Sequence, residues 1–154
     1  MNYETLLIEA EKNTVDVYEK IMPSSLKGLY SDRIIWINKN QSSTEKYCTL
    51  SEELGHHYKT SGHILDLKTI VNIKQERLAR NWGYKKLVHL QRIVQAHKFG
   101  VKNKYELADF LNVTEKFLDE AIQRYKEEYG LFKIVDGLTV CFDPLSIVEF
   151  FEEF

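Results

Sequence analysis

The segment from Glu52 to His57 places carboxylates and imidazoles at a spacing that can bind a metal ion. Residues four apart lie one above the other on a helix, so Glu52 and His56 are expected to project from the same face. A carboxylate oxygen and an imidazole nitrogen are both ordinary zinc ligands. Glu53 would lie beside this pair, where a carboxylate can act as the general base of a hydrolytic reaction. The segment therefore predicts metal-assisted hydrolysis.

The segment differs from the zinc-protease pattern His-Glu-x-x-His at the first ligand, where Glu52 replaces histidine. Because an isolated Glu-x-x-x-His pair is common on helices, an ordinary surface pair or helix contact is the competing interpretation. Nearby apolar residues that give the helix a buried side, the small Gly55 beside the expected metal, and the downstream carboxylate Glu76 all favour a metal site. The residues alone leave both interpretations open.

Two further histidines compete for a role at this site. His57 lies about 100° around the helix from His56, so a place beside the ligands or facing the substrate is favoured over ligation. His63 follows Gly62 and is the best substitute if Glu52 is not a ligand, although a solvated loop histidine is its plainer interpretation. Cys48, one turn before Glu52, is interpreted as a small buried hydrophobe.

Composition narrows the class of protein. The chain has 154 residues, 44% of them hydrophobic, and a formal net charge of −2. This near neutrality gives no general reason to bind nucleic acid or an anionic membrane. No apolar run approaches the roughly 18 residues of a membrane span, and the two cysteines, Cys48 and Cys141, are far apart in the sequence. These features predict a reduced, cytoplasmic protein with no membrane association.

Local patterns predict the elements that would position the motif. Apolar spacing predicts a short helix over Tyr3–Asn13, and the β-branched run Ile34–Asn38 predicts a hairpin with Leu29–Tyr30. The motif helix is expected over about Glu45–Lys59, capped by Ser43 or Thr44 and ended at Gly62. A second helix is expected over Lys74–Val88 and would carry Glu76.

The pattern changes in the C-terminal part. Residues 104–111 and 115–129, with Thr114 as a cap, read as a helix-turn-helix, and Phe132–Val135 with Leu138–Phe142 read as a hairpin around Asp136-Gly137. This order is winged-helix-like. The second of these helices carries more acids than bases, which makes DNA binding unfavourable because affinity for DNA depends largely on cations that contact phosphates. The six Lys and Arg residues between 83 and 104 are interpreted as a solvated helix face.

Several ordered motifs resemble the ImmA/IrrE family of metallopeptidases, especially small members from phages and mobile elements. The matching segments are residues 26–30, 34–38, 45–57, 60–62, 75–84 and 105–113, which span most of the chain. The resemblance implies an α+β fold, with a zincin-like part over 1–88 (a short mixed sheet plus the motif helices) and a winged-helix-like part over 89–154. The resemblance is specific because these motifs occur together in this order, and no single motif carries it.

The resemblance also implies a mechanism. Zn2+ held by Glu52, His56 and Glu76 would keep a fourth position for water, and Glu53 would be the catalytic base. The substrate would be a transcriptional repressor of a phage or integrative element, whose cleavage relieves repression. Two carboxylate ligands cancel the charge of zinc, so we expect weaker hydrolysis than from a full His-Glu-x-x-His site.

Two alternatives stay open at this point. The first is a non-catalytic antirepressor that has a degenerate metal site and acts by binding the repressor. The second is a DNA-binding regulator, which would show steeply salt-dependent affinity for DNA. The favoured interpretation of the C-terminal part is a degenerate winged helix that holds a protein partner, the repressor to be cleaved.

Overall fold

The computed structural model describes residues 1–59 and 70–149. The chain is a mixed α+β protein that divides into two compact units, Met1–Leu87 and Val88–Phe154. Within the described residues no helix is long and apolar enough to cross a lipid bilayer.

Within residues 1–59 and 70–87, the first unit contains three helices and a three-stranded sheet. In chain order its elements are α1 (Tyr3–Lys12), β1 (Asp16–Lys20), β2 (Gly28–Ser31), β3 (Ile34–Asn38), α2 (Ser43–Lys59) and α3 (Ile70–Leu87). The strand order is β1-β3-β2. The predicted hairpin is confirmed, because β2 pairs with β3 in antiparallel register, with Gly28 opposite Ile37. β1 pairs with β3 in parallel, so the sheet is mixed.

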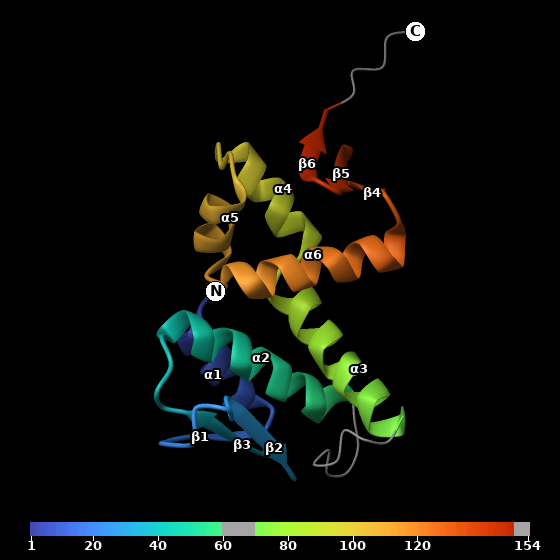
Figure 1. Ribbon diagram of the computed structural model, residues 1–154. Helices are drawn as coiled ribbons and strands as arrows, with labels where there is room; N and C mark the ends of the chain where they lie inside the picture. The colour runs from blue at the N-terminus through green and yellow to red at the C-terminus, as the bar shows by residue number, and fades with distance from the viewer. Residues whose placement is uncertain (60–69, 150–154) are drawn as a thin grey trace, which may run out of the picture. The chain divides into compact units, whose positions relative to one another are not determined.

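The core of this unit lies between the sheet and α2 (Figure 1). Alternate side chains of β3 point to opposite faces of the sheet, and Ile35 and Ile37 are fully buried. Leu50 and Leu54 of α2 are also fully buried, and α2 contacts both β2 and β3. Burial of these apolar residues fixes the rotation of α2 about its axis, and therefore which face carries the motif.

α2 and α3 pack closely and run in opposite directions. A Cβ atom built on Gly55 would lie 2.1 Å from the main-chain oxygen of Ala79, and one built on Gly83 would lie 2.8 Å from Oγ of Ser51. Gly55 therefore makes room for the α3 backbone, and the interpretation that it also borders a metal stays a prediction. Gly55 is required because the α3 backbone occupies the space where a side chain would be.

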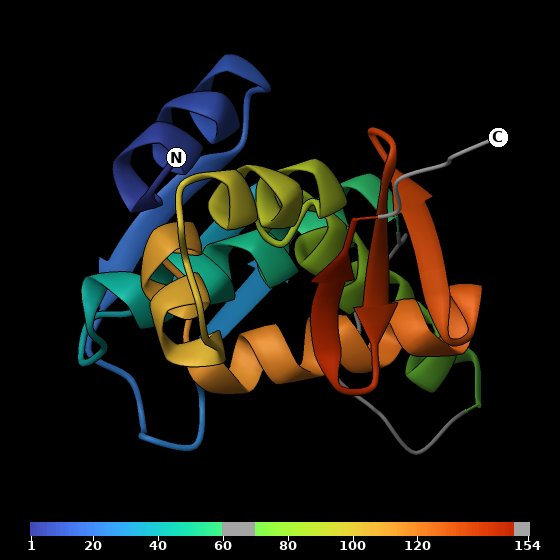
Figure 2. The same cartoon turned by 90° about the horizontal axis from the view of Figure 1, so that it is seen from above.

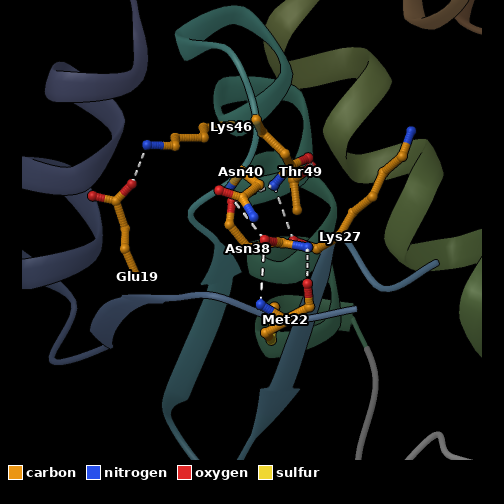
Figure 3. Close-up of polar contacts among 8 residues, drawn as sticks. Glu19, Met22, Lys27, Asn38, Asn40, Lys46 and Thr49 are labelled. Carbon is orange, nitrogen blue, oxygen red and sulfur yellow. Dashed lines mark hydrogen bonds and ion pairs between the residues drawn. The ribbon is translucent and has the colours of Figure 1, made fainter. Parts of the chain in front are cut away.

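The loop before β2 is held by the buried side chain of Asn38 (Figure 3). Its Nδ2 atom donates to the carbonyl oxygens of Met22, Pro23 and Leu26 at 3.1, 3.2 and 2.9 Å. Its Oδ1 atom accepts from the backbone N–H groups of Met22 and Asn40 at 3.4 and 3.1 Å. One amide thereby satisfies several backbone groups of a loop that has no regular structure.

The second unit contains α4 (Leu90–Lys98), α5 (Lys104–Leu111), α6 (Glu115–Tyr129), β4 (Phe132–Val135), β5 (Leu138–Phe142) and β6 (Leu145–Val148). The three strands form an antiparallel sheet in the order β4-β5-β6, and the sheet contacts α6 (Figure 2). Thr114 caps α6, as predicted, and accepts a hydrogen bond from the Phe117 backbone at 3.1 Å. The Asp136-Gly137 turn is also confirmed, since both residues have positive φ.

Some element boundaries differ from prediction. α2 begins at Ser43, and its cap is Ser42, whose Oγ accepts from the Glu45 backbone N–H at 3.1 Å, so the predicted cap at Ser43 or Thr44 is wrong. α3 begins at Ile70, four residues before the predicted start. The predicted stop at Gly62 lies outside the described residues. The elements α4, β1 and β6 had no predicted counterpart.

Candidate active site

His56 and Glu76 meet where α2 and α3 pack together. Nε2 of His56 lies 3.0 Å from Oε2 of Glu76, and the His56 side chain is buried. The contact lies close to the point where Gly55 meets Ala79, so the close approach of the two helices brings these side chains together. The structure thus places two of the three predicted zinc ligands in direct contact.

Charge is concentrated at this contact. The hydrogen bond from His56 lowers the pKa of Glu76, and Arg80 adds to the effect because its Nε atom lies 3.3 Å from Oε1 of Glu76. Burial alone would lower the pKa of His56, but the hydrogen bond to Glu76 and the nearby carboxylates of Glu53 and Glu52 raise it. Three acids therefore surround one imidazole, which is an environment that favours a cation.

The donor set can be compared with what zinc requires. Two ligand atoms on a tetrahedral zinc ion are roughly 3.3 Å apart, since each lies about 2.0–2.1 Å from the metal. The 3.0 Å separation in the His56–Glu76 pair fits two such positions. Across residues 1–59 and 70–149, no three His, Cys, Asp or Glu side chains are grouped closely enough to hold a metal. Ligation by Glu52 therefore stays a prediction, and the alternative ligand His63 lies outside the described residues.

Glu53 lies on the α2 face that is turned toward β2. A Cβ atom built on Gly28 would lie 3.1 Å from Cγ of Glu53 and 2.7 Å from Cγ2 of Thr49, so only glycine at position 28 leaves room for both side chains. Removal from water raises the pKa of the Glu53 carboxyl to about 8. His56 opposes this shift, whereas the charges of Glu52 and Glu76 add to it. A carboxyl with this pKa can exchange protons near neutral pH.

His57 is held by Tyr30 of β2, a residue to which the sequence pattern gives no role at the site. Oη of Tyr30 lies 2.8 Å from Nδ1 of His57, and the two rings meet edge to face with centroids 5.6 Å apart. Burial and the charge of Arg33 lower the pKa of His57. The alternation of β2 could have indicated this contact, because Tyr30 is two residues from Gly28 and lies on the same face of the strand.

Comparison with known proteins identifies the family. Residues 9–123 match the family model Peptidase M78, described as the IrrE N-terminal-like domain. The match covers most of the chain, so the protein belongs to this peptidase family, and the resemblance stated from the motifs is confirmed. No curated protein and no solved structure matched the chain. Membership supports a metallopeptidase type of function with a protein substrate.

Proposed function

We propose that the protein is a zinc-dependent endopeptidase that cleaves the transcriptional repressor of a phage or integrative element and so relieves repression. The observation that carries this proposal is the His56–Glu76 contact at 3.0 Å, with Glu53 on the same helix three residues before His56. The first unit would be zincin-like, since it joins a small mixed sheet to two helices that carry the predicted ligands.

Glu52, His56 and Glu76 would hold the zinc ion in this proposal. Glu52 and His56 are one helical turn apart on α2, and His56 already contacts Glu76 of α3. When bound, zinc supplies a Lewis acid that makes water a stronger acid and polarises a peptide carbonyl. Arg80 would hold Glu76 in place, because its Nε atom lies 3.3 Å from Oε1, the oxygen that does not face His56.

Glu53 would be the proton carrier of the reaction. Its carboxyl has a pKa of about 8 because it is removed from water beside two other acids. The pKa of Glu53 would fall toward neutrality beside a cation held by His56 and Glu76, because the positive charge favours the carboxylate. The Glu53 carboxylate can then accept a proton from the attacking water at Oε1 or Oε2 and deliver it to the leaving amine.

The second unit would bind the protein partner. The order of α5, α6 and the β4–β5 hairpin is that of a winged helix, with α6 in the place of a recognition helix. α6 carries Glu115, Asp119, Glu120, Glu127 and Glu128 against Lys116, Arg124 and Lys126. Several of these charges are already paired with each other or with neighbouring helices. This balance supports a protein partner over DNA.

A second candidate function is an antirepressor that binds the repressor without cleaving it. The observation that favours it is the lack of a group of three metal-ligating side chains within the described residues. In that case Glu76 and His56 would act as a structural pair that joins α2 to α3. The two functions differ in whether inactivation of the repressor requires the Glu53 carboxylate.

Co-incubation with the repressor encoded beside this protein tests the proposal. Purified protein loaded with zinc should cut the repressor at one bond, identified by mass spectrometry, and Glu53→Gln should abolish the cut while still binding the repressor. Glu11→Gln is the matched control, because Glu11 is an exposed carboxylate of α1. Equal cleavage by wild type and Glu53→Gln rules out the mechanism, and binding without cleavage by both favours the antirepressor.

A further inference from the structure

The hydrogen bond between Tyr30 and His57 belongs to a longer chain of contacts. The backbone N–H of Arg33 donates to Oη of Tyr30 at 3.3 Å, and Oη of Tyr30 lies 2.8 Å from Nδ1 of His57. Arg33 ends the turn between β2 and β3, Tyr30 lies in β2, and His57 lies in α2. The chain of contacts therefore ties the tip of a hairpin to the motif helix.

β2 and α2 match in spacing along this contact. Gly28 faces Glu53, and Tyr30 faces His57, so two residues of the strand correspond to four residues of the helix. Two strand residues span about 6.6 Å and four helical residues about 6 Å, which explains the match. His57 consequently lies one helical turn from Glu53, on the same side of α2.

The contacts of Tyr30 favour one position for the proton of a neutral His57. A phenol has one proton to donate, and the oxygen of Tyr30 already accepts the Arg33 N–H. With the phenol as donor, Nδ1 of His57 accepts its proton across the 2.8 Å contact. A neutral imidazole that accepts at Nδ1 carries its proton on Nε2. In that arrangement Nε2–H is the donor of His57.

The hairpin turn sets the position of the Arg33 N–H. Asp32 and Arg33 have φ values of 46° and 66°. Positive φ at both central residues is the conformation of a two-residue type I′ turn, whose twist matches that of the paired strands. The turn between β2 and β3 therefore places the Arg33 N–H against Oη of Tyr30.

We propose that Tyr30 fixes His57 as an Nε2–H donor that binds a main-chain carbonyl oxygen of the substrate next to Glu53. The proposal rests on the proposed peptidase function and adds a residue to it. His57 touches the substrate, whereas Tyr30 is a positioning residue that acts through His57. The ligand class is an extended peptide, because a single N–H donor beside a general base suits a backbone carbonyl.

The tautomer of His57 can be measured without any enzymatic activity. Long-range 1H–15N NMR of the metal-free protein at neutral pH should show His57 with Nε2 protonated and Nδ1 unprotonated. Tyr30→Phe should remove this preference, and Tyr18→Phe, which changes an exposed tyrosine of β1, should not. Protonation of Nδ1 in the wild-type protein overturns the proposal, whatever the activity of the protein.

Two substitutions of His57 separate binding of substrate from support of the fold. His57→Gln places an amide N–H near the position of Nε2, and His57→Asn places one near Nδ1, where it can still meet Tyr30. The substrate in this assay is the purified repressor encoded beside the protein. The kcat/KM of His57→Gln should stay within about threefold of the wild-type value. His57→Asn should lower kcat/KM about tenfold, the value of one lost hydrogen bond.

The opposite order would overturn the proposal, since a structural role requires the Tyr30 contact that only His57→Asn retains. Glu53→Gln, measured in the same assay, keeps this result separate from the proposed function. If Glu53→Gln loses cleavage while His57→Asn keeps a normal kcat/KM, the proposed role of His57 is rejected and the peptidase mechanism stands. Cleavage that does not depend on Glu53 rejects the peptidase mechanism, and the donor role with it.

Discussion

Nε2 of His56 and Oε2 of Glu76 lie 3.0 Å apart although the two residues are twenty positions apart in the sequence. The contact exists because α2 and α3 approach closely enough for Gly55 to touch the backbone of Ala79. The proposed zinc-ligand pair and the crossing of the two helices are therefore one structural feature.

Restoring histidine at the first ligand position should increase hydrolysis. Glu52→His would replace one of the two proposed carboxylate ligands, so a net positive charge would stay on the site and water there would become more acidic. A fall of about one unit in the pKa of that water corresponds to about a tenfold gain in rate below the pKa. The measurement is kcat/KM for the repressor, with Glu11→His as a control at an exposed position of α1. Unchanged or lower kcat/KM would contradict Glu52 as a substituted ligand.

Stability of the metal-free protein should fall as the pH rises from about 5 to 8. The pKa of Glu53 is about 8 in the folded state and ordinary in the unfolded state, so the folded protein binds the extra proton in this interval. The slope due to Glu53 approaches about 1.4 kcal/mol per pH unit. Urea unfolding in the presence of a chelator should show this slope in wild type and a much smaller one in Glu53→Gln. Identical slopes in the two proteins would mean that the carboxyl is not buried.

Gly55→Ala should destabilise the protein by about 3 kcal/mol, because the added Cβ would lie 2.1 Å from the main-chain oxygen of Ala79. Gly83→Ala should cost less, since its Cβ would meet the side-chain Oγ of Ser51 at 2.8 Å and the nearest backbone atom only at 3.3 Å. The cost that remains is movement of a hydroxyl that donates to the Cys48 carbonyl oxygen. Ala79→Gly should fail to rescue Gly55→Ala, because the clash is with backbone. Urea unfolding of the four proteins tests this order, and equal costs for the two glycines would refute it.

Asn38→Asp should destabilise the first unit by about 3 kcal/mol. The substitution replaces the Nδ2 donor to three carbonyl oxygens with an acceptor in a buried position. Asn40→Ala is the control, since Asn40 contributes its backbone N–H, which any residue other than proline retains. Thermal unfolding should show a large fall in Tm for Asn38→Asp and little change for Asn40→Ala. A similar Tm for both variants would show that the loop is held by other contacts.

Much of the fold follows from local patterns in the sequence. The motif helix, the β2–β3 hairpin and the α5–α6 pair with its Thr114 cap depend on residues that are close in the chain. α4 has a buried face formed by Ile93, Val94 and Ala96, which the interpretation of the basic residues between 83 and 104 as a solvated helix face does not include. β1 joins β3 in parallel across eighteen positions, and local periodicity contains no record of that pairing.

The site, like the fold, was predictable where it depends on residues that are close in the sequence. Glu53 and His56 follow from spacing on one helix, and Glu76 was singled out as a carboxylate on the next helix. The hydrogen bond of Tyr30 to His57 and the close approach of Gly28 to Glu53 depend on how β2 lies against α2. Such contacts between distant segments are set by packing, which no single-helix pattern encodes.

Zinc content tests the central claim most directly. After chelation and reconstitution with excess zinc followed by desalting, mass spectrometry under native conditions should find one zinc ion per wild-type chain. Glu76→Gln and His56→Gln should each lose the zinc ion. Glu9→Gln is the control and should retain zinc, because it removes a carboxylate of α1 that pairs with Lys86 of α3, away from the proposed ligands. A wild-type chain that binds no zinc, or full zinc content in Glu76→Gln, would contradict the account.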